Sequence, residues 1–224
     1  NQTIKVPLFQ TPDSRKALAQ LSRKFYGYPD QKLTLIGITG TNGKTTTSYL
    51  IEETLTKLGA KTGLISSLQN KIGRLTKKSK LTTPESLDLY QLLAQMVNQK
   101  VEYGVMEVSS HALKLNRVHG IDFDRQVLTN ITPDHLNFHS SFAAYRRTKA
   151  QLFQINDSPA VINTDLSFAD QFQNKIRGPI ISYGLKPPAQ FRARRIETGR
   201  RGISYQLETP TDKYQVNLNL LGKF

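Results

Sequence analysis

The sequence of 224 residues contains no cysteine, few acidic side chains and no long apolar run. The lack of cysteine excludes disulfides and thiolate metal sites within these residues. No stretch approaches the roughly 20 apolar residues of a membrane-spanning helix, so membrane insertion is not expected. The chain begins at Asn1 without the basic and apolar segments of a signal peptide. We therefore expect it to be part of a longer, cytoplasmic protein.

Acidic residues number 17 against 31 lysines and arginines, which gives a net charge of +14. The basic residues concentrate at 71–80 and 192–201. No helix-turn-helix, aromatic RNA-binding strand or zinc knuckle accompanies them, so we expect no nucleic-acid partner. A basic surface that faces solvent or small anions explains the charge, and missing parts of a longer chain can balance it.

The stretch around which the chain is organised is 33–48, which reads LTLIGITGTNGKTTTS. A short apolar run leads into spaced glycines, then Lys44 and a run of threonines. This order is typical of a strand, a phosphate-binding loop and a helix, here expected over about 44–58. Lys44 supplies charge for the terminal phosphates, and Thr45 supplies a hydroxyl for the accompanying Mg²⁺.

The phosphate-loop pattern departs from the usual one at Ile38, where a glycine is common. The alternative is a glycine-rich turn that binds no ligand. Such a turn needs neither the lysine nor the threonines that follow it. The sequence therefore favours mononucleotide binding.

Elsewhere, short apolar runs alternate with segments of helical periodicity, and the tail changes to short alternating strands. The pattern predicts an α/β fold: a P-loop-type, mostly parallel sheet with helices on both faces, plus a small antiparallel β-section near the C-terminus. Strands are expected at 33–39, 61–66, 103–108, 126–129, 160–163, 180–183, 190–198, 204–208 and 214–220, with a hairpin over 70–79. Helices are expected at 14–26, 142–153 and 168–176.

A further helix is expected from Thr83 as N-cap and Pro84 as first helical residue to about Gln99. Capping alone accounts for Thr82 and Thr83 as well as a ligand-binding role does.

Two strand ends carry polar side chains of functional type. Glu107 closes the strand at 103–108, and the carboxyl edge of a parallel sheet is where such folds bind ligands. The segment 130–139 follows the next strand and combines an amide, a carboxylate and two imidazoles, which suits nucleotide and divalent-metal contacts. It could equally be a capped turn with Asp134 as N-cap.

Lys149 is the least expected residue of its helix. Phe142, Tyr145, Leu152 and Phe153 share one helical face, and Lys149 falls in the middle of it. A lysine on a packed face is costly unless it snorkels, pairs or is chemically changed.

Four blocks of the sequence resemble the central ATPase domain of the Mur ligase family. They are TGTNGKTTT at 39–47, LTTPE at 81–85, MEVSSHAL at 106–113 and TNITPDHLNFH at 129–139, with Tyr145 and Lys149 behind the last. Their order and spacing agree over roughly residues 11–224. The block at 106–113 is similar to the family branch that adds the third residue of the peptidoglycan peptide.

The resemblance implies ATP-dependent amide formation through an acyl phosphate. The acceptor would be UDP-MurNAc-L-Ala-D-Glu, and the added residue meso-diaminopimelate or L-lysine. It implies a UDP-binding N-terminal domain joined through the connector 1–32, a central ATPase domain at 33–224, and a C-terminal domain that binds the amino acid. Both flanking domains lie outside this sequence. A monomer is expected.

The resemblance also implies roles for individual residues. Lys44, His135 and Lys149 would be catalytic. One Mg²⁺ would be held by Thr45 and Glu107 and a second by His135 and Lys149, the lysine as a carbamate. The residues expected at ATP are Gly40, Thr41, Asn42, Gly43, Lys44, Thr45, Thr46 and Asn130. Those expected at the muramoyl substrate are Thr82, Thr83, Ser109 and Arg117.

The sequence departs from the family pattern at Pro133, where arginine is common, and at Asn137 and Phe138, which replace an aspartate–tyrosine pair. None of these changes removes an expected metal ligand. Two alternatives stay open: another amide ligase of the superfamily, of the folylpolyglutamate or cyanophycin synthetase type, and a nucleotide-binding scaffold without ligase activity.

Overall fold

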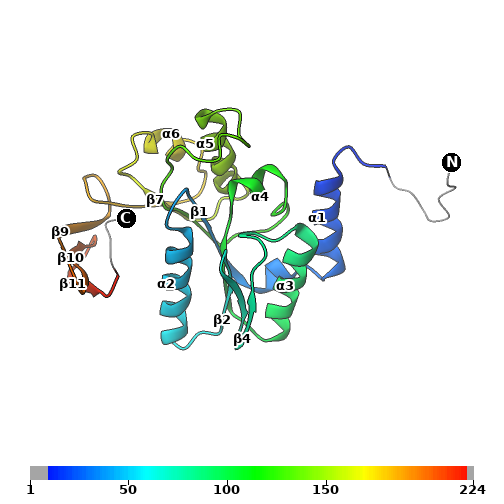
Figure 1. The fold of residues 1–224 in the computed structure, drawn as a ribbon, viewed down its shortest axis with the longest axis horizontal. Helices are drawn as coiled ribbons and strands as arrows, with labels where there is room; N and C mark the ends of the chain where they lie inside the picture. The colour runs from blue at the N-terminus through cyan, green and yellow to red at the C-terminus, as the bar shows by residue number, and fades with distance from the viewer. Residues whose placement is uncertain (1–9, 221–224) are drawn as a thin grey trace.

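A single sheet runs through the molecule in the computed structural model, which describes residues 10–220 (Figure 1). Its strand order is β11-β10-β9-β8-β7-β6-β1-β5-β2-β3-β4. The strands are β1 (Thr34–Thr39), β2 (Thr62–Ile65), β3 (Gln69–Ile72), β4 (Leu75–Lys78), β5 (Tyr103–Glu107), β6 (Arg125–Leu128), β7 (Ala160–Asn163), β8 (Ile180–Gly184), β9 (Phe191–Gly199), β10 (Gly202–Glu208) and β11 (Lys213–Leu218).

The helices are α1 (Ser14–Phe25), α2 (Lys44–Lys57), α3 (Ser86–Asn98), α4 (Ser110–Lys114), α5 (Phe142–Ala150) and α6 (Ala169–Gln173), with short 3₁₀ turns at Pro29–Lys32 and Gln151–Gln154. None of them is both long and apolar enough to cross a membrane, within the residues described.

The centre of the sheet is parallel. β1 lies between β5 and β6, with Ile38 opposite both Glu107 and Val127. β2, β7 and β8 extend the parallel part on either side. Because the central strands run in the same direction, the loops that follow β1, β2, β5 and β6 emerge at one edge of the sheet.

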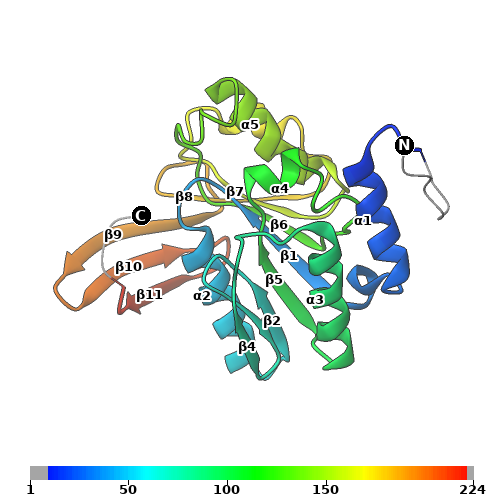
Figure 2. The same cartoon turned by 45° about the vertical axis from the view of Figure 1, so that its right-hand side comes forward.

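The two faces of the sheet are covered by different helices (Figures 1 and 2). Ile38, Leu64 and Val105 form a small buried cluster against which side chains of α2 pack. Their strand neighbours point to the other face and join a larger core with α3, α1 and α5, which includes Leu35, Met106 and Leu93. This alternation follows from the two-residue period of a strand.

The predicted fold class is confirmed, including the antiparallel section at β9–β11, which continues the same sheet. The hairpin predicted at 70–79 forms β3 and β4, with its turn at Gly73, where φ is +57°. Ile38, the departure from the phosphate-loop pattern, is a fully buried strand residue rather than part of the loop.

The predicted start of α3 is wrong. The helix begins at Ser86 and its N-cap is Glu85, not Thr83. The reason is that the Thr83 hydroxyl is used elsewhere: it donates to the Glu107 carbonyl at 2.8 Å and accepts from the Ser109 amide at 3.1 Å. Asp134 is not an N-cap either, because Ser141 caps the next helix. The α-helix expected to run to Phe153 ends at Ala150 and continues as a 3₁₀ turn.

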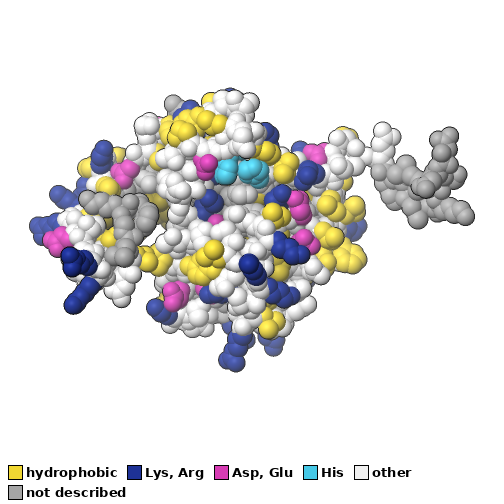
Figure 3. Space-filling view, in the orientation of Figure 1, with side chains coloured by type: hydrophobic (Ala, Val, Ile, Leu, Met, Phe, Trp, Pro, Cys, Tyr) yellow, Lys and Arg dark blue, Asp and Glu magenta, His cyan; other side chains and the backbone are white. Residues whose placement is uncertain are grey.

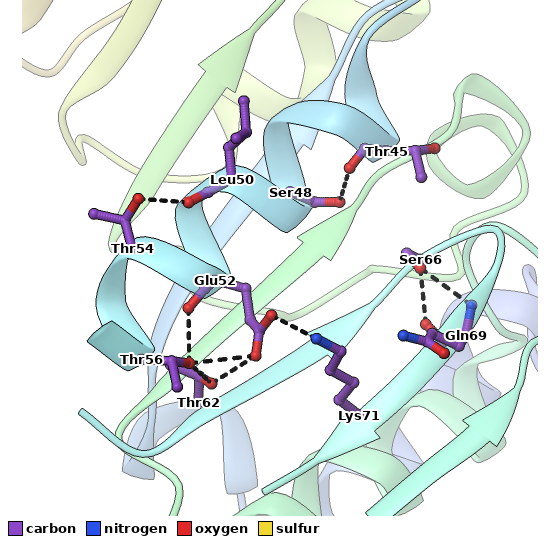
Figure 4. A network of polar contacts seen from close by, with 10 residues as sticks. All are labelled: Thr45, Ser48, Leu50, Glu52, Thr54, Thr56, Thr62, Ser66, Gln69 and Lys71. Carbon is purple, nitrogen blue, oxygen red and sulfur yellow. Dashed lines mark hydrogen bonds and ion pairs between the residues drawn. The ribbon is translucent and has the colours of Figure 1, made fainter. Parts of the chain in front are cut away.

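A buried carboxylate fixes α2 to the strands beneath it (Figure 4). The side chain of Glu52 is 7% exposed and accepts from the Thr62 hydroxyl at 2.8 Å and from the Lys71 ammonium at 2.8 Å. Thr56 donates to the Glu52 carbonyl at 2.9 Å. The carboxylate thus joins α2, β2 and β3. The loop that is predicted to bind phosphate leads directly into α2.

We expect Glu52→Ala to lower the free energy of unfolding by about 2–4 kcal/mol, because it leaves a partly buried ammonium and hydroxyls without their acceptor. Glu53→Ala is the matched control: Glu53 is exposed on the same helix, and its loss should change stability by less than about 0.5 kcal/mol. Chemical denaturation of both variants measures the difference, and equal stabilities would show that the network contributes nothing.

Candidate active site

The loop after β1 requires glycine at two positions. Gly40 has φ of +150°, and a Cβ there would lie 1.9 Å from the Thr129 hydroxyl. Gly43 has φ of +81° and is the N-cap of α2. The loop is held from the neighbouring strand end: Thr41 N donates to the Asn130 carbonyl at 2.8 Å, and Asn42 N donates to the Asn130 side chain at 2.9 Å. The backbone amides at the start of α2 are therefore pre-arranged for an anion.

Two lysines converge on one backbone carbonyl. Lys44 Nζ donates to Gly40 O at 3.1 Å and to Thr41 O at 2.8 Å, and Lys149 Nζ donates to Gly40 O at 2.6 Å. Lys149 comes from α5, more than a hundred residues further along the chain, and is 1% exposed. Its neighbours include the ring of Tyr145, whose centroid lies 4.7 Å from Nζ.

Burial dominates the electrostatics of both lysines. Burial, with a smaller effect of the positive charge of Lys44 and against the opposing effect of Asp134, lowers the pKa of Lys149 to about 7. Burial also lowers the pKa of Lys44, against a smaller opposing effect of Glu107 and Asp134. Two like charges close together in a poorly solvated place favour an anion beside them.

Glu107, Thr45 and Ser67 form one polar cluster at the carboxyl edge of the sheet. Ser67 donates to the Glu107 carboxylate from its backbone amide at 2.9 Å, and its hydroxyl lies 3.0 Å from that of Thr45. Glu107 is 1% exposed. Ser67 was missed in the sequence analysis, although its place directly after the strand at 61–66 is the signal that could have found it.

His135 lies in a group of rings between α4 and α5. Its ring centroid is 5.0 Å from that of His111 and 6.4 Å from that of Tyr145, which also neighbours Lys149. His111 stacks on Phe138 at 4.0 Å. Figure 3 shows the histidine side chains together on one face of the molecule, beside an acidic one.

The imidazole of His139, which belongs to the same group of rings, is neutral near pH 7. His139 is buried, its Nε2 lies 3.1 Å from the Ser110 hydroxyl, and burial lowers its pKa to about 4. The cluster of His111, His139 and Tyr145 around the exposed His135 was not predicted from the sequence, because these residues come from three separate segments.

The residues expected at the muramoyl substrate also lie together, but the Thr83 hydroxyl is buried and already hydrogen-bonded. Arg117 donates to the Thr83 carbonyl at 3.1 Å, and its guanidinium lies 2.6 Å from the carboxylate of Glu85. The Thr83 side chain is fully buried and satisfied by Glu107 and Ser109, so its hydroxyl shapes the loop rather than facing solvent. Thr82 and the Ser109 side chain are half-buried at the same loop.

The arrangement has the donors for an anion and for oxygen-ligated cations. The loop supplies backbone amides and Lys44; Thr45 and Glu107 supply a hydroxyl and a carboxylate, which are hard oxygen ligands of the kind Mg²⁺ takes. Thr46 is exposed at the same helix start. Among residues 10–220, no three acidic or histidine side chains group as a metal cluster.

Comparison with known proteins extends this description. Residues 38–224 match the family described as the Mur ligase middle domain. The chain is 42% identical over 212 residues to a UDP-N-acetylmuramoyl-L-alanyl-D-glutamate–2,6-diaminopimelate ligase of Caldanaerobacter subterraneus, which covers 95% of this chain and 44% of the relative. The enzyme of the same name from Geobacillus thermodenitrificans is 42% identical over 99% of this chain and 47% of its own.

Solved structures agree with the sequence relatives. A 2,6-diaminopimelate ligase of the same name superposes with a TM-score of 0.86 at 28% identity, covering 99% of this chain and 47% of that one. A Mycobacterium tuberculosis folylpolyglutamate synthase superposes with a TM-score of 0.73 at 18% identity, which shows a shared fold. The chain spans just under half the length of the curated relatives that it matches. Through its middle domain, the chain belongs to the Mur ligase family.

Proposed function

We propose that this chain is the ATP-binding middle part of an amide ligase that extends the peptide of a peptidoglycan precursor. The carboxylate of UDP-MurNAc-L-Ala-D-Glu would take the γ-phosphate of ATP, and an amine would then displace phosphate from the acyl phosphate. The names of the relatives favour 2,6-diaminopimelate as the amine over L-lysine. One observation carries the proposal: Lys44 and the buried Lys149 meet on Gly40 O, beside a Thr45–Ser67–Glu107 cluster.

The site residues would bind the phosphates, the metal ions and the muramoyl substrate, each according to its side-chain chemistry. Lys44 and the amides of Gly40–Thr45 hold the ATP phosphates, and Thr46 and Asn130 support the loop and nucleotide. Thr45 and Glu107 would hold one Mg²⁺, and His135 with Lys149 a second. Bound Mg²⁺ neutralises charge on the transferred phosphoryl group, which is where most catalysis of this reaction lies. Thr82, Ser109 and Arg117 would contact the muramoyl substrate, Arg117 through an anionic group, and the buried Thr83 would hold the loop that carries Thr82 in place.

Lys149 fits this scheme as a carbamate. An amine must be neutral to attack CO₂, and burial lowers the pKa of Lys149 to about 7. In that step the nitrogen forms a bond to the carbon of CO₂, one N–H proton leaves to solvent, and an oxygen takes the negative charge. The product replaces one of two repelling ammonium groups with an anionic oxygen ligand.

The proposal covers a longer protein than these 224 residues. It includes a connector at 1–32 and a central domain at 33–224, with a UDP-binding and an amino-acid-binding domain outside this sequence. It also includes a monomeric state and a cytoplasmic location. The small amine and the uridine end of the acceptor would be bound mainly outside this chain.

The reaction is tested by phosphate release from the full-length protein with ATP, Mg²⁺ and UDP-MurNAc-L-Ala-D-Glu, adding diaminopimelate, L-lysine or ornithine singly. We expect release that requires both the acceptor and diaminopimelate. Phosphate release that does not need the acceptor, or no phosphate release under any condition, would contradict the ligase activity. The protein would then be a nucleotide-binding protein of another function.

Lys44→Met should weaken ATP binding by about 100-fold or more, because it removes a charge-assisted contact of the phosphates. Lys57→Met is the matched control at the exposed far end of the same helix and should bind ATP as the unaltered chain does. Calorimetric titration with ATP and Mg²⁺ measures both, and equal affinities would remove Lys44 from the site.

Lys149→Ala should abolish turnover of the full-length protein, and an added small carboxylate should restore part of it. In the unaltered protein, ¹³CO₂ should give a carbamate signal in ¹³C NMR near pH 7, because a substantial fraction of the Lys149 amine is neutral there. An exposed lysine, whose amine becomes neutral only near its ordinary pKa of about 10.4, should give none there. Full activity of the alanine variant without additive would exclude a ligand role for Lys149.

A further inference from the structure

The antiparallel section β9–β11 is amphipathic, and its apolar face stays partly exposed among the residues that the structure describes. Strand register places Ala193, Leu207 and Tyr214 side by side, and next to them Tyr205 and Val216. The face is completed by Ile203 and Leu218, which also pair directly. Arg195 and Ile196 lie opposite Tyr205 where the register shifts, in a β-bulge. Within residues 10–220, none of these side chains joins the buried core clusters.

The opposite face of the same strands is polar and internally satisfied. Arg192, Glu208 and Lys213 are direct cross-strand neighbours, and Lys213 lies 3.1 Å from the Glu208 carboxylate. These cations hold the pKa of Glu208 down to about 2. This face needs no partner, since its charges pair with one another at the surface.

The two faces therefore place different demands on their surroundings. An amphipathic sheet is stable when its apolar face packs on another layer. Here Tyr214 is 53% exposed and Ile196 is 37% exposed. The main contacts of β9, β10 and β11 are with one another and with β8. In Figures 1 and 2 the section projects from one side of the molecule, away from α1, α3 and α5.

The charge around this face is mostly positive. Arg195, Arg200 and Arg201 are all exposed on or beside β9, and Figure 3 shows Lys and Arg side chains over this part of the molecule. The whole chain carries a net charge of +14. An apolar surface with an acidic rim is the complement of such a face.

We propose that the apolar face of β9–β11 is an interdomain docking face, covered in the full-length protein by a domain outside these 224 residues whose contact surface is apolar with an acidic rim. The relatives contain more chain outside the matched region than within it, so the protein has material for such a layer. A segment that continues from β11 would start beside the face, which raises its effective concentration there. The proposal concerns assembly and does not depend on the ligase reaction.

Cysteine labelling tests it, because the chain has no cysteine of its own. Tyr214→Cys probes the apolar face, and Gln215→Cys is the matched control on the polar face of the same strand. Both parent residues are exposed, so both cysteines should react with a maleimide at similar rates in the 224-residue chain. In the full-length protein, with any other cysteines resolved by mass spectrometry, we expect the Tyr214→Cys rate to fall at least tenfold and the Gln215→Cys rate to stay unchanged.

Three results would overturn the proposal. Equal labelling of both sites in the full-length protein would show an uncovered face. Protection of Tyr214→Cys in the 224-residue chain that grows with protein concentration would assign the face to a second copy. Protection that requires anionic lipid vesicles would assign it to a membrane surface. Val216→Cys repeats the measurement from a neighbouring position, so a folding defect of one variant does not decide the outcome. Labelling needs no turnover, so the outcome is independent of whether the ligase assay succeeds.

Discussion

The carbonyl of Gly40 holds the site together by accepting from two ammonium groups at once. Lys44 reaches it from the first turn of α2, and Lys149 reaches it from α5. The contact depends on glycine, since a Cβ at position 40 would collide with Thr129. While both amines are protonated, two cations on one neutral acceptor leave excess positive charge in a buried place, which favours either a bound anion or the conversion of Lys149 that we propose.

The parallel sheet is what allows this convergence. The loop after β1 brings the amides that we propose bind phosphate, the end of β5 brings Glu107, and the end of β2 brings Ser67. Because these strands are parallel neighbours, their carboxyl ends share one edge, while their amino ends and the Glu52 network lie away from the chemistry. The Glu52 network fixes α2 on strands β2 and β3. The loop that leads into α2 is therefore held by the helix on one side and by Asn130 on the other.

The central strands of the sheet are well packed, whereas the antiparallel strands β9–β11 have an apolar face that is partly exposed. Residues of β1, β5 and β6 are buried on both faces, as expected for a parallel sheet between helices. Strands β9–β11 have their polar face satisfied by ion pairs and their apolar face half exposed. This contrast agrees with our proposal that a domain outside these residues covers the flank.

The sequence by itself determined the elements that local pattern controls. The spaced glycines with Lys44 and Thr45 specified the phosphate loop, and the two-residue and helical periods specified the strands, most helices and the odd position of Lys149. Tertiary structure alone decided contacts between distant segments. The Thr83 hydroxyl is drawn to Glu107 and Ser109 and so cannot cap α3, Ser67 joins Thr45 to Glu107, and Lys149 meets Gly40. Such pairings depend on which strands become neighbours, and strand order is not written in the period of any one segment.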